Sequence, residues 1–319
     1  MRKICYFTFY FIVFMMSSLR AEDISSAEGV YSQIADITQP TLKDYYLIQD
    51  YLTHGDRPFI KRLCDYEPNA RNFKIIGHTI DELPQSGFIA VNSDESEREN
   101  CFVIYSSFNK NYPRGLKRVV DYISQSDFKG HILYWLGGWP NIEGGSLILA
   151  HVPYAFKISA IKEAQRRGYK RVFWLDTAVL PHVSLNIIFK MIENKGYFVM
   201  GNSHMIGPYM DPHAAAALGV SIEEANQIPS CSAGIFGVDF TNEIGAKIVD
   251  LWYKAALDRE AFFSPRSDQN ALSVILYQLC IQDFINIKQL AHNKEQINES
   301  TLLRIEREFV NELSLQSRE

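Results

Sequence analysis

The 319-residue chain lacks the short motifs of the commonest phosphate-binding sites. A glycine-rich stretch, GGWPNIEGG at 137–145, matches neither the GxGxxG dinucleotide fingerprint nor the Walker loop. Glycine allows close backbone approach, so this stretch could wrap a sugar or a diphosphate, or it could be an ordinary tight connection. No internal repeat or low-complexity segment is present. These absences argue against a dinucleotide site and a P-loop nucleotide site.

Runs of basic residues are missing as well. The chain carries 32 Lys and Arg against 37 Asp and Glu, a net charge of −5, with no run of five or more basic side chains. Nonspecific binding of nucleic acid depends on phosphate neutralisation by Lys and Arg. We therefore expect no nucleic-acid partner.

Cysteines are few and show no metal-binding spacing. Of five, Cys5 lies in the N-terminal apolar run, and the other four are far apart in the sequence, with no CxxC or Cys/His pattern. A structural zinc site is therefore not expected. In an exported protein an even number of cysteines permits one or two disulfides, and four buried free thiols are the alternative. The four are Cys64, Cys101, Cys231 and Cys280.

The N-terminus has the pattern of a signal peptide. Arg2 and Lys3 precede an apolar and aromatic run over 4–16, which is shorter than the ~20 residues of a membrane-spanning helix. We predict a signal peptide over 1–21, cleavage after Ala21 and export to a periplasm, a secretory lumen or the medium, with no stable transmembrane span. Leu19 is larger than the residue preferred before the cleavage site, so an uncleaved membrane anchor is the alternative.

Composition predicts a large core in one main domain. The chain is 47% hydrophobic and 13% aromatic, which disfavours disorder. Residues 22–96 read as a mostly helical appendage, 97–290 as the main domain, and 291–319 as a C-terminal helix. Between 101 and 290 strand-like and helix-like segments alternate, a pattern typical of parallel pairing through crossover helices. The fold class expected is α/β, with a mixed, mostly parallel, Rossmann-like sheet flanked by helices.

The segment RVFWLDTAVLP at 171–181 carries the leading site candidate. Its apolar run is typical of a strand covered on both faces, and the run ends on Asp176. A carboxylate just past such a strand lies where open α/β sheets bind ligands. The alternative is that Asp176 caps a turn.

Three further residues are candidates for the same crevice. Lys157 precedes Asp176 by nineteen residues in an expected helix, and its charge could stabilise a phosphate leaving group. Asp268 and Gln269 begin another expected helix. Asp268 could orient or deprotonate an acceptor hydroxyl, and Gln269 could hydrogen-bond to a sugar. A solvated lysine and a simple helix cap are the alternatives.

The segment SCSAGIFG at 230–237 approaches a serine-hydrolase nucleophile elbow around Ser232. Ser230 stands where that turn needs glycine, and the segment continues into a strand rather than a helix. A serine hydrolase is therefore the least favoured reading. As a pocket wall, the small residues Ser232, Ala233 and Gly234 would let a ligand approach the backbone.

Histidines offer little support for a metal site at Asp176. The candidates are His204, His213 and His292, and none has the i, i+4 spacing to another ligand that a helical metal site would use. Structural or surface positions are the simpler interpretation for all three.

Four segments together resemble the GT-A fold of nucleotide-sugar-dependent glycosyltransferases, over roughly residues 100–290. They are FVIYSSFNKNYPRGL, VPYAFKISAIKEAQRRGYKRVFWLD, SAGIFGVDF and SDQNAL. The resemblance implies a nucleotide edge at Tyr105, Ser106 and Ser107. It matches Asp176 to the first aspartate of the family's Asp-x-Asp metal motif, and it matches Asp268–Gln269 to a segment that contacts donor sugar and acceptor.

Ala178 departs from the family pattern, because it stands where the second metal-binding aspartate is expected. A divalent cation such as Mn²⁺ or Mg²⁺ prefers several oxygen ligands and neutralises the diphosphate leaving group. The resemblance implies transfer of a hexosyl group from a nucleoside diphosphate sugar to a glycan or other hydroxyl acceptor. Three versions stay open: a metal site built on Asp176 and distant ligands, a metal-independent enzyme using Lys157, and a silent domain that binds glycans or a protein.

Overall fold

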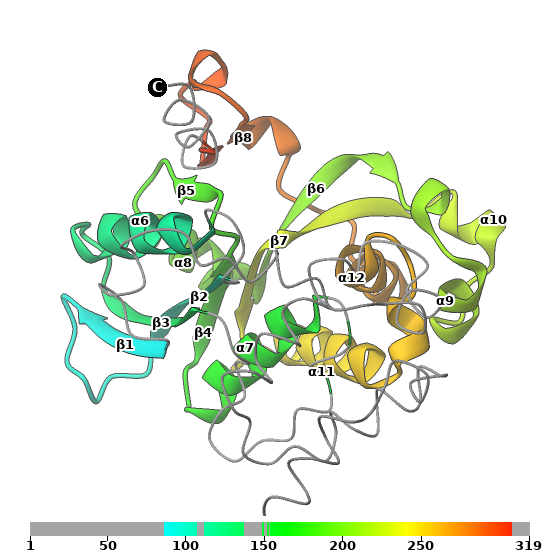
Figure 1. The fold of residues 1–319 in the computed structure, drawn as a ribbon, viewed down its shortest axis with the longest axis horizontal. Helices are drawn as coiled ribbons and strands as arrows, with labels where there is room; N and C mark the ends of the chain where they lie inside the picture. The colour runs from blue at the N-terminus through cyan, green and yellow to red at the C-terminus, as the bar shows by residue number, and fades with distance from the viewer. Residues whose placement is uncertain (1–85, 107–111, 137–148, 150–151, 153, 308–319) are drawn as a thin grey trace, which may run out of the picture.

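The computed structural model describes residues 86–106, 112–136, 149, 152 and 154–307 (Figure 1). The predicted signal peptide, most of the predicted appendage, the glycine-rich stretch, Ser107 and Cys64 lie outside these residues. Within them, no helix combines the length and the apolarity needed to cross a bilayer.

Strands and helices alternate along the chain as expected. The strands are β1 Ser86–Val91, β2 Asn100–Ser106, β3 Gly130–Leu136, β4 Arg171–Leu175, β5 Val179–Pro181, β6 Tyr197–Met205, β7 Pro229–Asp239, β8 Leu290–Ala291 and β9 Leu303–Ile305. The α-helices are α6 Tyr112–Ser124, α7 Ala155–Arg166, α8 Leu185–Lys195, α9 Pro212–Ala217, α10 Ile222–Ala225, α11 Glu243–Leu257 and α12 Ser267–Gln278. Short 3₁₀ turns are η3 Gly207–Tyr209, η4 Arg259–Phe262, η5 Ile287–Gln289 and η6 Lys294–Gln296.

The main sheet is mixed, and the expectation that it is mostly parallel is wrong. Its strand order is β1-β3-β2-β4-β7-β6. The pairs β2/β3 and β2/β4 are parallel, whereas β1/β3, β4/β7 and β6/β7 are antiparallel. Helices α6 and α7 do make the crossovers that parallel pairing needs. The α/β class is thus confirmed, and the proportion of parallel pairs is lower than expected.

The antiparallel half arises from the connection between β6 and β7. That connection contains η3, α9 and α10, whereas a crossover between parallel strands would need a longer helix. These short helices instead sit at the end of a long β6–β7 ribbon (Figure 1). Six residues in α9 and four in α10 are too few to cross back over a sheet. Helix length, more than helix presence, therefore separates a crossover from a ribbon.

Helices cover both faces of the sheet. Side chains alternate along β4, so that Val172 and Trp174 join one apolar cluster while Phe173 and Leu175 join the other. Buried residues of α7, α11 and α12 belong to the first cluster, and those of α6 and α8 belong to the second. This two-sided burial explains why the strand is apolar throughout rather than alternating.

The C-terminal helix expected over 291–319 is not found in the described part of that range. Residues up to Arg307 contain β8, η6 and β9, and β5, β9 and β8 form a second, three-stranded sheet. Leu303 is fully buried in this pairing. Pairing with the edge of β5 outweighs the local helical signal, because intrinsic propensity is a weak preference that tertiary contacts override.

The first described strand lies inside the range assigned to the appendage. β1 pairs antiparallel with β3 over its whole length, so the main sheet begins before residue 97. Three cysteines fall in the described residues, and all are free thiols: Cys101 and Cys231 are buried, and Cys280 is exposed.

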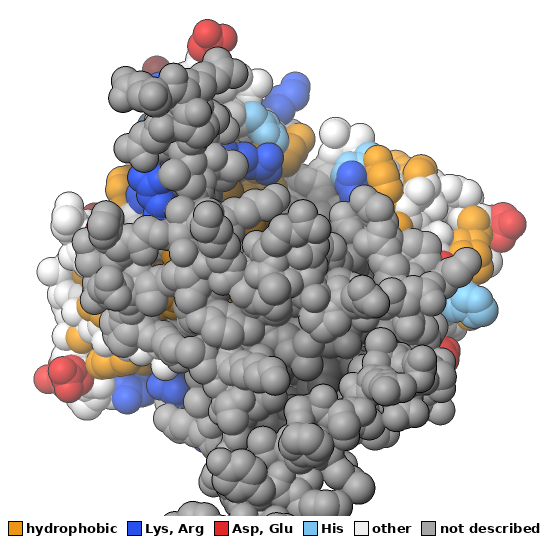
Figure 2. Space-filling model, in the orientation of Figure 1, with side chains coloured by type: hydrophobic (Ala, Val, Ile, Leu, Met, Phe, Trp, Pro, Cys, Tyr) orange, Lys and Arg blue, Asp and Glu red, His pale blue; other side chains and the backbone are white. Residues whose placement is uncertain are grey.

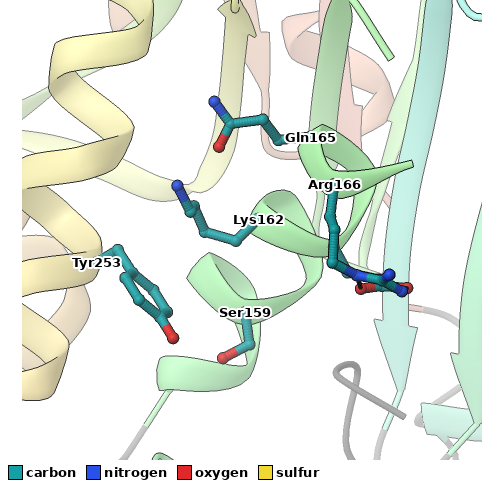
Figure 3. A pocket seen from close by; sticks show the side chains of 6 residues that line it. Ser159, Lys162, Gln165, Arg166 and Tyr253 are labelled. Carbon is teal, nitrogen blue, oxygen red and sulfur yellow. Dashed lines mark hydrogen bonds and ion pairs between the residues drawn. The ribbon is translucent and has the colours of Figure 1, made fainter. Parts of the chain in front are cut away.

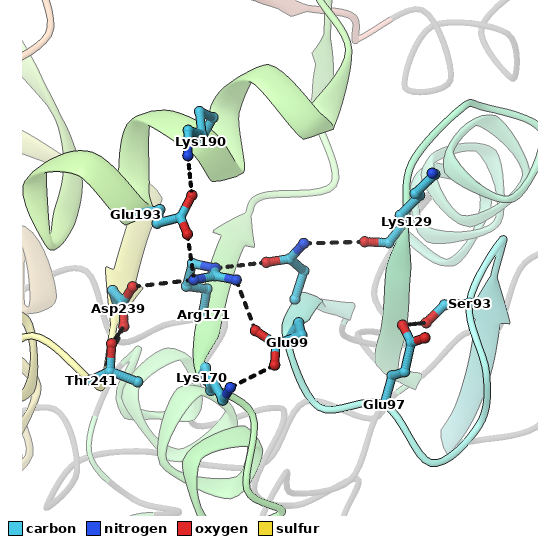
Figure 4. Close-up of polar contacts among 11 residues, drawn as sticks. Ser93, Glu97, Glu99, Lys129, Lys170, Arg171, Lys190, Glu193, Asp239 and Thr241 are labelled. Carbon is cyan, nitrogen blue, oxygen red and sulfur yellow. Dashed lines mark hydrogen bonds and ion pairs between the residues drawn. The ribbon is translucent and has the colours of Figure 1, made fainter.

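A charged network fixes the edge of the sheet where β2 and β4 begin (Figure 4). Arg171 forms ion pairs with Glu99 at 3.0 Å, Glu193 at 3.4 Å and Asp239 at 3.6 Å, and its Nε donates to Asn100 Oδ1. One guanidinium thus joins β4 to α8, to β7 and to the start of β2. Since β2 and β4 are parallel, their opposite ends, where Asp176 follows, share a common edge.

A buried histidine predicts acid-sensitive stability. His131 in β3 is fully buried, with Nε2 donating to the Asp94 carbonyl oxygen at 2.9 Å and Nδ1 2.7 Å from the Tyr169 hydroxyl. Burial lowers the pKa of His131, although the Asp94 contact opposes the shift. The unfolded chain therefore binds the proton first as pH falls below about 6.5.

We expect the free energy of unfolding to decrease between pH 7 and 5, by at most about 1.4 kcal/mol per pH unit from this residue. Urea unfolding of the native chain and of His131→Gln over this pH range measures it. The variant is expected to show the shallower dependence, and parallel curves would contradict the assignment.

Candidate functional site

Asp176 lies directly after β4, with its backbone fixed by the neighbouring strand. Its N–H donates to the Gly234 carbonyl of β7 at 2.9 Å, and its own carbonyl accepts from Val179. Trp174 Nε1 donates to Asp176 Oδ1 at 3.1 Å. The side chain is 44% exposed. Asp176 therefore takes part in a local turn, as the simpler interpretation held, and also presents a carboxylate to solvent.

Lys157 connects Asp176 to Asp268. It lies in the first turn of α7, 7% exposed, with Nζ 2.8 Å from Asp268 Oδ2 and 3.5 Å from Asp176 Oδ1. Asp268 lies in the first turn of α12 and is equally buried. The ring of Tyr154 lies 5.4 Å from Nζ. Three residues that are far apart in sequence, each a separate prediction, thus form one charged cluster.

The cluster holds Lys157 in its charged form. Burial by itself lowers the pKa of this lysine, but the attraction of Asp176 and Asp268 outweighs burial and raises the pKa above its ordinary value. Two carboxylates and one ammonium give the cluster a net charge of −1. Because Lys157 and Asp268 are buried, that excess charge is accessible at Asp176.

Gln269 forms a second set of contacts beside this cluster. Its Nε2 donates to Ser230 Oγ of β7 at 2.8 Å, and Asn202 Nδ2 of β6 lies 3.2 Å from the same oxygen. Asn202 also donates to the Cys231 carbonyl at 2.8 Å. The side chain predicted to bind a sugar is thus engaged through its amide nitrogen. This set of contacts ties the start of α12 to β6 and β7.

The predicted nucleotide edge contributes mainly buried side chains. Tyr105 and Ser106 end β2 and are buried. Tyr105 stacks on Phe156, with ring centroids 4.4 Å apart, and Phe156 contacts Trp174. Burial raises the pKa of Tyr105. Tyr105 therefore belongs to the aromatic packing around Trp174, which precedes Asp176. Ser107 lies outside the described residues.

The small residues of β7 divide between pocket and core. Ala233 is buried, whereas Ser232 and Gly234 are half-buried. A Cβ added at Gly234 would lie 2.5 Å from Asp176 Oδ2, so only glycine leaves room for the carboxylate. Ser232 lies inside β7 and not at a strand-to-helix turn. The nucleophile elbow of the hydrolase reading is therefore not formed at Ser232.

Asp176 is a candidate protein ligand for a divalent cation, without a group of three ligands around it in the described residues. Among the residues that the structure describes, no three His, Cys, Asp or Glu side chains lie close enough to hold a metal ion. Mg²⁺ is often bound by one or two carboxylates together with substrate phosphates. Asp176 fits that pattern, because it is exposed and belongs to a net negative cluster. The Lys157 ammonium opposes binding of a cation by the protein alone.

Sequence reasoning missed several residues that shape this site. Trp174 was assigned to the core, yet it orients Asp176 through its indole N–H. Tyr154 has a φ of 61°, a left-handed backbone conformation that is uncommon for a residue other than glycine. Asn202 and Arg266 contact residues that are distant in the sequence, and no local sequence pattern predicts such contacts. For Trp174 alone a signal existed, since residues i and i+2 of a strand share a face.

A separate depression of about 340 Å³ opens between α7 and α11 (Figure 3). Tyr253 of α11 faces Ser159 and Lys162 of α7 there. Lys162 forms an ion pair with Asp250 at 2.9 Å. None of the predicted site residues lines this depression, so it is distinct from the Asp176 cluster.

Two comparisons of the chain with known proteins were negative. No protein-family model matches it, and the search of curated proteins gives no match.

Proposed function

We propose that the chain is a glycosyltransferase that moves a hexosyl group from a nucleoside diphosphate sugar to a hydroxyl acceptor. The observation that supports this most is the Asp176–Lys157–Asp268 cluster at the end of β4. An exposed carboxylate fixed at this edge of an α/β sheet suits the binding of a polar ligand. The sequence resemblance to GT-A enzymes supplies the reaction class, because fold class alone does not determine chemistry.

Each residue of the cluster has a distinct role in the proposal. Asp176 organises the donor, and it would hold a Mn²⁺ or Mg²⁺ ion that offsets the charge of the diphosphate. Lys157 is shared by two carboxylates, so it acts as a positioning residue for Asp176 rather than as a free phosphate ligand. Asp268 is buried behind Lys157, which makes it a positioning residue too. Gln269 helps to fix the position of β7 through its hydrogen bond to Ser230.

Asp176→Asn tests the proposal with little change in shape. We expect sugar transfer or donor hydrolysis to fall by about 10²–10³-fold, because the amide removes the charge that organises the donor. The measurement is turnover of a panel of UDP- and GDP-sugars by purified protein, with and without Mn²⁺. Asp250→Asn, an exposed carboxylate on α11, is the control and should keep full activity.

A catalytically silent binding domain is the second candidate. Ala178, which replaces the expected second aspartate, is held by its carbonyl, which accepts from the Glu306 backbone N–H at 2.8 Å. Because the Ala178 carbonyl is already hydrogen-bonded and its side chain is a methyl group, this position favours a rigid surface over a second metal ligand. If the native chain neither turns over nor binds any sugar nucleotide, with or without Mn²⁺, the transferase proposal fails and the silent domain takes its place.

A further inference from the structure

Arg266 is held firmly at the start of α12, and no carboxylate of the described part of the chain pairs with it. Its guanidinium lies 3.7 Å over the ring of Tyr209 and donates to Nε2 of His204. Because Nε2 accepts, His204 is neutral, and burial together with the Arg266 charge lowers the pKa of His204. Within the described residues no Asp or Glu pairs with Arg266, whereas Arg171 faces three carboxylates.

An arginine held in this way is suited to an anion. A guanidinium presents a planar fork of N–H donors that matches a carboxylate or a phosphate in two parallel hydrogen bonds. Stacking on Tyr209 and the bond to His204 restrict its rotamers, which lowers the entropy lost on binding. Arg266 is half-buried and Tyr209 is exposed. In Figure 2, basic, histidine and hydrophobic side chains meet at the surface over the β6–β7 ribbon.

The Arg266 contacts continue the polar wall that begins at Asp176. His204 lies two residues after Asn202 on β6. Arg266 lies three residues before Gln269. The contact of His204 with Arg266 therefore follows the contact of Asn202 and Gln269 with Ser230 along the same junction of β6 and α12.

The strand order places the Arg266 contacts on the opposite side of Asp176 from the predicted nucleotide edge. From the predicted nucleotide edge the order is β2, β4, β7 and β6. Asp176 follows β4, and His204 lies on β6, away from β2. Along β7, Ser230 is four residues from Gly234, which is roughly 13 Å of extended strand. A donor whose nucleotide contacts β2 and whose diphosphate contacts Asp176 would end before Arg266.

We propose that Arg266, supported by Tyr209 and His204, binds an oxyanion on the acceptor, which is therefore an acidic sugar or a phosphorylated sugar. The acceptor role rests on the proposed transferase function. The binding of an oxyanion at Arg266 does not, since it follows from the geometry of the guanidinium alone.

Ligand-observed NMR of the full chain tests the subsite with three probes: glucuronic acid, glucose 6-phosphate and neutral glucose. We expect at least one charged probe to bind about tenfold or more tightly than glucose, and its identity separates a carboxylate from a phosphate subsite. Arg266→Gln should remove this preference, and Arg266→Lys should keep part of it. Arg166→Gln removes the same charge from the far end of α7 and should keep the preference whole.

Two results would overturn the subsite: no preference for a charged probe in the native chain, or an unchanged preference in Arg266→Gln. UDP-sugar binding separates this outcome from failure of the transferase. Asp176→Asn should lose UDP-sugar binding and retain the charged-probe preference, and Arg266→Gln should do the reverse. A native chain that binds charged probes through Arg266 but no sugar nucleotide would keep the oxyanion site and exclude its role as an acceptor site.

Discussion

Replacing Lys157 by methionine is expected to lower the free energy of unfolding by about 3–5 kcal/mol, the largest effect of any substitution proposed for this chain. The methionine fills similar space, so loss of packing is small. The cost arises because Asp268 stays buried with its compensating ammonium gone. Since domains are stabilised by only about 5–15 kcal/mol, a loss of this size removes a large share of the total.

Urea unfolding measures this effect, with a control on the same helix. Lys162→Met removes a lysine from the next turn of α7, but the side chains of its ion pair with Asp250 are 29% and 53% exposed, far more than those of Lys157 and Asp268. That change should cost less than about 1 kcal/mol. The double variant Lys157→Met/Asp268→Leu should recover much of the loss, since it buries no unpaired charge. Equal effects of Lys157→Met and Lys162→Met would show that the buried cluster is not a coupled unit.

Substituting Gly234 by alanine is expected to reduce sugar transfer by about 100-fold while the fold persists. The added methyl group would lie 2.5 Å from Asp176 Oδ2, so the carboxylate must rotate away. Rotation weakens the Trp174 hydrogen bond and the Lys157 ion pair. A displacement of about 1 Å at a reacting group can cost on the order of 100-fold in rate.

Turnover and thermal unfolding of Gly234→Ala, measured together, separate a displaced carboxylate from a damaged fold. Gly168→Ala is the matched control, because its Cβ meets open space and its φ of 87° makes any added side chain strained. This control should lose up to about 1 kcal/mol of stability and no activity. Full activity in Gly234→Ala would show that the position of Asp176 does not govern the reaction.

Local sequence patterns predicted the elements of this fold better than their pairing. The apolar run before Asp176 gave β4 correctly, and the helices expected at Lys157 and at Asp268 are α7 and α12. The direction of β7 and the pairing of β9 with β5 could not be read in the same way. Both depend on which strand edges are free to pair, and that is a property of the assembled sheet.

For the candidate site as well, the sequence indicated the residues but not their contacts. Asp176, Lys157 and Asp268 could be named from the sequence because each has a chemically distinctive side chain at the end of an element. That Lys157 lies between the two carboxylates follows only from how α7 and α12 pack on the sheet. Arg266 and His204 are separated by 62 positions and meet only because the β6–β7 ribbon packs beside the start of α12.

The pairing of β5 with β9 makes the end of the chain a requirement for the turn after Asp176. Arg118 donates to the Thr177 carbonyl and contacts Glu306, whose backbone N–H binds the Ala178 carbonyl. The two contacts of Glu306 join residues separated by more than a hundred positions, so they form only after residue 306 has been synthesised. A chain cut before β9 would therefore keep the contact of Arg118 with the Thr177 carbonyl but lose both contacts of Glu306 with this turn.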